Sequence, residues 1–79
     1  MRLDKYLKVS RLIKRRTVAN EACDNERVTV NGKVARASYD VKVGDKIEIA
    51  LGTRTVAVEV LQVAEAVRKD DAAAMYKEV

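Results

Sequence analysis

Hydrophobic and polar positions repeat with a helical period at the start of the chain. One set of residues recurs at the three- and four-residue spacing of a single helix face: Leu3, Tyr6, Leu7 and Ser10. A second helix is predicted from about Val18 to Asp24, with the Thr17 hydroxyl as its N-cap. The first part of the chain is therefore expected to contain two helices, each able to pack one face against a core.

The period changes to two from Val28 onward, which predicts β-strands. Val28 and Val30 precede Asn31-Gly32, a dipeptide that tolerates positive φ at both central positions of a tight hairpin turn. The residues from Lys33 to Arg36 then form the second arm. We expect an antiparallel hairpin directly after the second helix.

A second hairpin is predicted in the later part of the chain. Gly44-Asp45 predicts a turn, and Lys46 to Leu51 alternates polar with apolar residues. Gly52-Thr53 predicts the next turn, and Thr55 to Ala64 a long strand that pairs antiparallel with the first. Asp70 to Tyr76 has the composition of a short helix with acids at its N-terminal end. The predicted fold class is α+β, with two N-terminal helices packed on a small, mostly antiparallel sheet and a short C-terminal helix.

Composition limits what this fold can contain. With 79 residues, the chain is long enough for one domain, 1–79, and a single modest core. There is no Trp, Phe or Pro, so the core must use Val, Ile, Leu and Ala with help from three Tyr. The one cysteine, Cys23, is expected to behave as a small hydrophobe in a reducing compartment. A charged N-terminus and the lack of a long apolar run predict a cytoplasmic protein with no signal peptide and no membrane partner.

Charge is distributed unevenly along the chain. Residues 1–36 carry ten cations and four anions, a net charge of +6, whereas residues 37–79 carry six cations and eight anions, a net charge of −2. Seven of the cations fall in the first sixteen residues, beside a single acid, Asp4. This imbalance is too one-sided for a surface that serves solubility alone, and it predicts a polyanionic partner for the first third of the chain.

The residues required by common enzyme chemistries are missing. There is no His to act as a general base or metal ligand, and a single Cys cannot build a thiolate zinc cluster. The three glycines, Gly32, Gly44 and Gly52, are widely spaced turn residues and match no phosphate-binding loop. Asp70-Asp71 is interpreted as a helix start and not as an acid–base pair. We therefore predict no catalytic residue, no cofactor, no metal and no enzymatic activity.

The placement of the cations favours phosphate binding. Arg2, Lys5 and Lys8 recur every three positions along the first helix, and Arg11 lies one more step along the same stripe. The run from Lys14 to Arg16 precedes the start of the second helix, where free backbone N–H groups and the helix dipole attract anions. Few aromatic residues are available to stack bases, since packing is the favoured interpretation of Tyr6 and Tyr39. Binding should therefore depend on phosphate groups, and strongly on salt.

Several motifs lie in an order and spacing that can be compared with known families: Arg2-Leu3-Asp4-Lys5-Tyr6-Leu7, Ser10-Arg11, Arg15-Arg16, Val28-x-Val30-Asn31-Gly32-Lys33 and Ser38-x-x-Val41-x-x-Gly44-Asp45-x-Ile47. Over roughly residues 1–50 they resemble the RNA-binding domain first described in ribosomal protein S4, the alpha-L RNA-binding motif. The C-terminal strands and short helix, about 51–79, would complete this domain. Within the superfamily, the chain is similar to small bacterial factors of ribosome-associated quality control and to a heat-shock family that binds released large subunits.

The resemblance implies that RNA is gripped by the two helices and the adjoining hairpin. Asp4, unusual in a basic patch, would either orient a neighbouring arginine, accept a hydrogen bond from RNA, or stabilise the N-terminal end of its helix. Together with the phosphate argument above, the resemblance gives the predicted RNA-binding residues: Arg2, Asp4, Lys5, Lys8, Arg11, Lys14, Arg15, Arg16, Thr17, Asn20, Lys33 and Arg36.

The resemblance also implies a function. It predicts a non-catalytic factor that binds rRNA and tRNA on large ribosomal subunits carrying stranded peptidyl-tRNA, and that helps an RqcH-type partner add alanine tails. A heat-shock-type factor that recycles large subunits would use the same patch and need no tailing partner. An accessory domain of an RNA-modifying enzyme, such as a pseudouridine synthase, is the third alternative, although a chain this short lacks the catalytic domain. A monomer is expected, because no long apolar edge or coiled-coil seam is present.

Overall fold

The computed structural model describes residues 1–79 and contains both helices and strands. The helices are α1 (Leu3–Val9), α2 (Arg16–Asp24) and α3 (Lys69–Ala72), and a 3-10 turn, η1 (Ala73–Met75), follows α3. The strands are β1 (Val28–Val30), β2 (Lys33–Val34), β3 (Lys46–Leu51), β4 (Arg54–Val60) and β5 (Tyr76–Glu78). None of the helices is long and apolar enough to cross a membrane.

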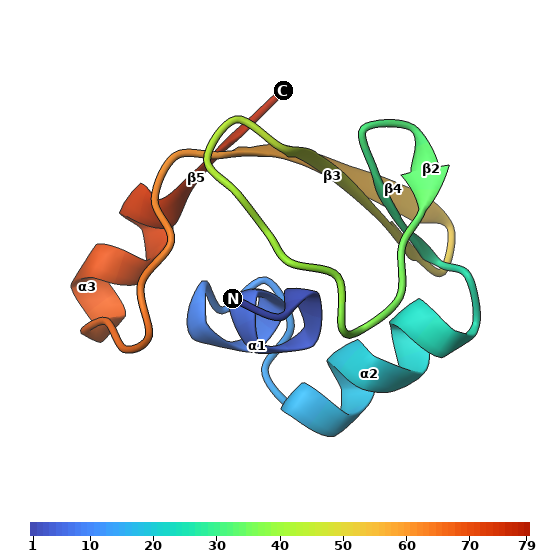
Figure 1. Cartoon of the computed structure of the whole chain (residues 1–79), viewed down its shortest axis with the longest axis horizontal. Coiled ribbons are helices and arrows are strands. Elements are labelled where there is room, and N and C mark those ends of the chain that lie inside the picture. The colour runs from blue at the N-terminus through green and yellow to red at the C-terminus, as the bar shows by residue number, and fades with distance from the viewer.

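The five strands form one sheet in the order β2-β1-β3-β4-β5, and all neighbouring pairs are antiparallel. In Figure 1, α1 and α2 lie on one face of this sheet, and α3 lies at the end of the molecule where β5 is found. The predicted α+β class, with two N-terminal helices on an antiparallel sheet, is therefore confirmed. Asn31 and Gly32 both have positive φ, as the predicted hairpin turn requires.

The core lies between α1, α2 and the covered face of the sheet. Leu3, Tyr6 and Leu7 of α1 are fully buried and meet the inward residues of the central strands, including Ile47 and Ile49 of β3. Alternate residues of β3 are exposed, which is the period-two pattern expected of a sheet with one solvated face. Tyr6 is the one fully buried aromatic residue of the core, whereas Tyr39 and Tyr76, which were also expected to contribute, are partly buried and pack against it.

Cys23 belongs to this core, in agreement with the prediction of a small hydrophobe. Its side chain is buried against the other apolar residues of α2. Burial, assisted by the negative charges of Asp4 and Asp24, raises the pKa of the Cys23 thiol to about 11. The thiol is therefore protonated at neutral pH and packs as an uncharged group.

The predicted start of the second helix was wrong. The helix begins at Arg16, not Val18, and Arg15 occupies the N-cap without a side-chain capping hydrogen bond. Thr17 lies inside the first turn and is exposed. The Ala19 N–H already donates to the Arg15 carbonyl at 3.0 Å. Because the Arg16 side chain is fixed by a hydrogen bond to Asp4, the first turn forms two residues before the position that local propensity favours.

The first hairpin is shorter than predicted on its second arm. Only Lys33–Val34 pair with β1, whereas Arg36 lies beyond the strand. The chain leaves the sheet because its backbone groups find partners on α1: the Asp4 N–H donates to the Ala37 carbonyl and the Leu3 N–H to the Tyr39 carbonyl. The segment after β2 is thereby held against the start of α1.

The C-terminal part also differs from the prediction. Strand β4 ends at Val60 and not at Ala64, because the next two backbone N–H groups, of Leu61 and Gln62, donate to the Met75 carbonyl. The predicted helix over 70–76 is only the short α3 and the η1 turn. Tyr76 instead begins β5, which pairs with β4 at the edge of the sheet.

Candidate nucleic-acid interface

Asp4 is the centre of a hydrogen-bond cluster on the N-terminal helices. The Arg2 Nε donates to Oδ1 of Asp4 at 3.2 Å, and the Arg16 Nε donates to Oδ2 at 3.3 Å. Asn20 Nδ2 also donates to Oδ2 at 3.3 Å, and the Lys5 backbone N–H donates to Oδ1 at 2.8 Å. One carboxylate therefore binds side chains from the start of α1 and from the first two turns of α2.

The carboxylate is buried, while the groups that it binds remain partly exposed. The side chain of Asp4 is 3% exposed, against 51% for Arg2 and 48% for Arg16. Burial by itself raises the pKa of Asp4, but hydrogen bonds from Arg2, Asn20, Arg16 and the Lys5 N–H outweigh it and hold the pKa below its ordinary value. Asp4 is thus charged at neutral pH and fixes two half-exposed guanidinium groups.

The hairpin cations lie beside this cluster. Arg2, Asn20 and Arg36 line one cavity of about 500 Å³ between α2 and the segment after β2. Arg36 and Lys33 line an adjoining cavity of about 650 Å³. We name the set Arg2, Asp4, Arg16, Asn20 and Arg36 the Asp4 surface. The structure therefore brings these five predicted residues together, with Lys33 at the margin.

A polar cluster around the buried Asp45 supports the hairpin that carries Lys33. Asp45 accepts hydrogen bonds from Asn31 Nδ2 at 3.1 Å, from the Tyr39 hydroxyl at 3.0 Å and from the Lys42 N–H at 3.0 Å. Burial raises the pKa of Asp45, but these donors, the Lys42 N–H first, lower it on balance. Asn31 Oδ1 in turn accepts from the Lys46 N–H, so the turn is anchored to β3.

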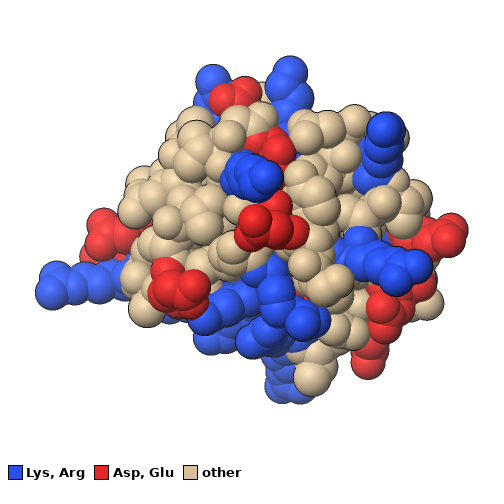
Figure 2. Space-filling view, viewed as in Figure 1, with Lys and Arg blue, Asp and Glu red and all other residues tan.

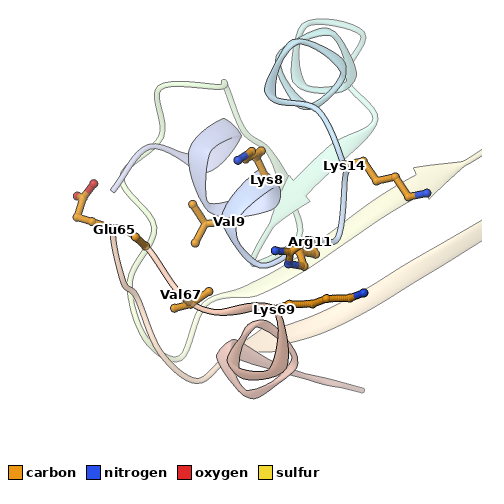
Figure 3. Close-up of a pocket in the computed structure, with 8 residues that line it drawn as sticks. Lys8, Val9, Arg11, Lys14, Glu65, Val67 and Lys69 are labelled. Carbon is orange, nitrogen blue, oxygen red and sulfur yellow. The ribbon is translucent and has the colours of Figure 1, made fainter.

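The remaining predicted cations do not form a single row. Lys5 makes an ion pair with Glu65, from the segment before α3. Lys8, Arg11 and Lys14 line a separate cleft of about 600 Å³, shown in Figure 3. Arg15 is exposed at the N-cap of α2, whereas Thr17, also exposed, lines a hollow together with Asp4, Arg16 and Asn20. In the view of Figure 2, the largest group of Lys and Arg side chains lies over α1 and the start of α2.

One cation of the cleft that Lys8, Arg11 and Lys14 line was not predicted from the sequence. Lys69, the first residue of α3, lines the same cleft as Lys8 and Arg11. It lies far along the chain, in the half with net negative charge, and no local pattern connects it to the N-terminal helices. Only the tertiary structure places it beside them.

The S4 domain family matches residues 1–47. The RQC P-site tRNA stabilizing factor of Streptococcus pneumoniae is 54% identical over 77 residues, covering 98% of this chain and 88% of that protein. The chain belongs to the RQC P-site tRNA stabilizing factor family of S4 domain proteins. Another member of this family, from Bacillus subtilis, is 51% identical over 76 residues, covering 96% of this chain and 88% of its own length.

Two solved structures share the fold of this family member. Heat Shock Protein 15 of Vibrio cholerae, described as trimeric, aligns with a TM-score of 0.93 and 28% identity, over 100% of this chain and 81% of that one. The solution structure of a hypothetical protein, HP1423, aligns with a TM-score of 0.85 and 32% identity, over 100% of this chain and 96% of the other. The S4-type fold inferred from the sequence is therefore confirmed.

Proposed function

We propose that the chain is a non-catalytic factor of ribosome-associated quality control, which binds rRNA and tRNA on obstructed large ribosomal subunits as a monomer. In this role it supports the addition of C-terminal alanine tails by an RqcH-type partner. The observation that carries the proposal is the pair of half-exposed guanidinium groups, Arg2 and Arg16, held by the buried Asp4 carboxylate. Membership of a family whose curated members are named P-site tRNA stabilizing factors supports tRNA as a ligand.

The geometry suits a phosphate backbone. Arg16 donates to Asp4 only through Nε, so both of its Nη groups can donate to a phosphate. Because Asp4 already orients both arginines, less side-chain freedom is lost when RNA binds. Few aromatic rings are available to stack a base, since Tyr6 is fully buried and Tyr39, which lines the cavity beside Lys33 and Arg36, is half-buried with its hydroxyl bound to Asp45. Recognition would therefore depend on the RNA backbone and its shape.

The first test is sedimentation of tagged protein through a sucrose gradient, with identification of the copurifying RNA and protein. We expect the wild type to sediment with large subunits that carry tRNA, and Arg16→Ala to stay at the top of the gradient. Arg54→Ala is the matched control, because Arg54 is an exposed arginine at the start of β4 that forms no ion pair. If the wild type fails to sediment with ribosomes, or both variants behave alike, the proposal is wrong.

A second candidate function is recycling of released large subunits, which the TM-score of 0.93 with Heat Shock Protein 15 favours. The two functions differ in their need for the tailing partner. If the quality-control proposal is right, cells without this protein lose alanine tails on stalled nascent chains. If recycling is the function, tailing is unchanged and free subunits with bound tRNA accumulate after heat shock.

A further inference from the structure

We propose that the cleft between α1 and the segment 65–69 is a second RNA phosphate site, which the C-terminal residue Lys69 completes. The RNA ligand rests on the proposed function. The site itself is new, because Lys69 lies outside residues 1–47, the part that matches the S4 domain family. We name this the Lys69 cleft.

The Lys69 cleft collects cations from three separate segments. Lys8 comes from α1, Arg11 and Lys14 from the loop after it, and Lys69 from the start of α3. In Figure 3, Arg11 lies beside Lys69, and the side chains of Lys14 and Lys69 extend in the same direction. The volume of about 600 Å³ leaves room for a phosphate group with part of its nucleotide.

No anion of the protein neutralises these side chains. None of the four cations takes part in an ion pair. The one acid of the lining, Glu65, is paired with Lys5 and points away from the other cations in Figure 3, with Val9 and Val67 between. Four exposed positive charges around one hollow repel each other in the free protein. A bound phosphate would relieve this repulsion and release its own counterions.

The backbone at Arg11 provides an independent observation. Arg11 has φ of +64°, a left-handed conformation in which a side chain costs about 1–2 kcal/mol and which usually selects glycine. The turn is held by its hydrogen bonds, from the Arg11 N–H to the Lys8 carbonyl and from the Ile13 N–H to the Leu7 carbonyl. This turn places the Arg11 side chain in the lining of the cleft, where its guanidinium can bind a ligand.

RNA fits the Lys69 cleft better than an acidic protein segment does. Lys14 precedes Arg15 and Arg16 directly, so an exposed run of three cations leads from the cleft to Arg16 of the Asp4 surface. A nucleic-acid backbone carries negative charge at regular intervals and could follow such a path. An acidic protein segment would instead need Asp and Glu side chains at the spacing of these cations. Three of the four cations are lysines, whose ammonium groups bind phosphate as point charges.

The test uses the purified full chain and fluorescein-labelled tRNA, with binding followed by fluorescence anisotropy between 50 and 200 mM salt. For Lys69→Gln we expect affinity to fall about threefold to tenfold, and the slope of log affinity against log salt to decrease by about 0.7–0.9. Lys77→Gln is the matched control, because Lys77 is an exposed lysine of β5 outside the cleft. Its affinity should stay within about twofold of the wild type.

The outcomes separate this site from the proposed function. If Arg16→Ala weakens tRNA binding but Lys69→Gln and Lys77→Gln bind tRNA with equal affinity, the proposal of a phosphate site in the Lys69 cleft is wrong. The proposed function survives in that case. If wild type binds no tRNA, both proposals fail.

Acetylation of wild-type lysines, read by mass spectrometry, avoids any effect of substitution on folding. Added tRNA should protect Lys69 and not Lys77, and protection by poly-glutamate but not by tRNA would assign the cleft to an acidic protein partner.

Discussion

Asp4 is a negative residue on which a positive surface depends. Its buried carboxylate accepts hydrogen bonds from Arg2, Arg16 and Asn20. Replacement with Asn keeps the shape but removes the charge and leaves an amide N–H₂ facing these donors. We expect Asp4→Asn to lower the free energy of unfolding by about 1–3 kcal/mol, measured by urea denaturation. It should also weaken RNA binding, although the net charge of the protein rises.

Asp24→Asn is the control for that prediction. Asp24 is exposed at the end of α2 and forms no ion pair, yet its replacement changes the net charge by the same amount. General electrostatic attraction predicts that both variants bind RNA more tightly than the wild type. Tighter binding by Asp4→Asn would therefore show that orientation of Arg2 and Arg16 by the carboxylate is not needed.

The same carboxylate gives a pH dependence of defined sign. The pKa values of Asp4 and Asp45 are both lowered in the folded protein, because hydrogen-bond donors outweigh the effect of burial. Each contributes stability that is complete above the unfolded pKa, about 3.9, and is lost as the pH falls through the lower folded value. Urea midpoints should therefore stay constant from pH 7 to about 5 and fall below about pH 4. Asp4→Asn should show a smaller fall, and an equal fall would contradict the assignment.

For individual residues, the sequence predicted which residues belong to the candidate site better than it predicted which residues they contact. Arg2, Asp4, Arg16 and Asn20 were all predicted, and the suggestion that Asp4 orients an arginine is confirmed. Lys5 was placed in the same row, but its side chain pairs with Glu65, sixty positions away. Contacts of that separation leave no periodic signal in the sequence, and Lys69 was missed for the same reason.

The ends of the two N-terminal helices offer a matched pair of substitutions. Arg11 after α1 and Glu26 after α2 both have positive φ, +64° and +59°, at positions where glycine is favoured. Replacement with Gly should raise the free energy of unfolding by up to about 1 kcal/mol in each case, since relief of backbone strain is partly offset by greater freedom of the unfolded chain. Only Arg11→Gly should weaken RNA binding, by about threefold to tenfold in the anisotropy assay.

Comparing the two glycine variants separates the effect of losing the Arg11 side chain from the effect of changing the backbone. Both helix ends are closed by backbone hydrogen bonds, from the Arg11 N–H to the Lys8 carbonyl and from the Glu26 N–H to the Cys23 carbonyl. A loss of RNA affinity in both variants would mean that helix geometry, and not the Arg11 guanidinium, supports binding. A strong destabilisation by either glycine would show that the observed φ is not strained.

Elements defined by local signals were predicted well. The Asn31-Gly32 turn and the strand Lys46–Leu51 are present at the predicted positions, because turn chemistry and alternation are local properties. The three-residue strand β5 was missed, since Tyr76–Glu78 has no strand pattern and forms only by pairing with β4. Helix α2 begins before Thr17 because tertiary bonds to Asp4 override the preference for a threonine cap.

At the scale of the whole molecule, the N-terminal RNA-binding elements and the C-terminal segment share one core. The Tyr6 hydroxyl of α1 donates to the Met75 carbonyl at 2.8 Å, and the Met75 side chain is fully buried in the same cluster. Residues 1–47, which match the S4 domain family, therefore do not bury their own helix face alone. The C-terminal segment supports α1 from one side and carries Lys69 to the edge of the cleft.

Because the two parts of the chain share one core, two substitutions at the contact between Tyr6 and Met75 should lower the free energy of unfolding by different amounts. Met75→Ala removes a fully buried side chain and should cost about 2–5 kcal/mol in urea denaturation, a large share of the stability of so small a core. Tyr6→Phe should cost only about 0.5–1.5 kcal/mol, because the Met75 carbonyl still accepts from the Leu61 and Gln62 N–H groups at 2.8 and 3.1 Å. If Met75→Ala were as mild as Tyr6→Phe, the C-terminal segment would be an independent addition and not a part of the core that holds the RNA-binding helices in place.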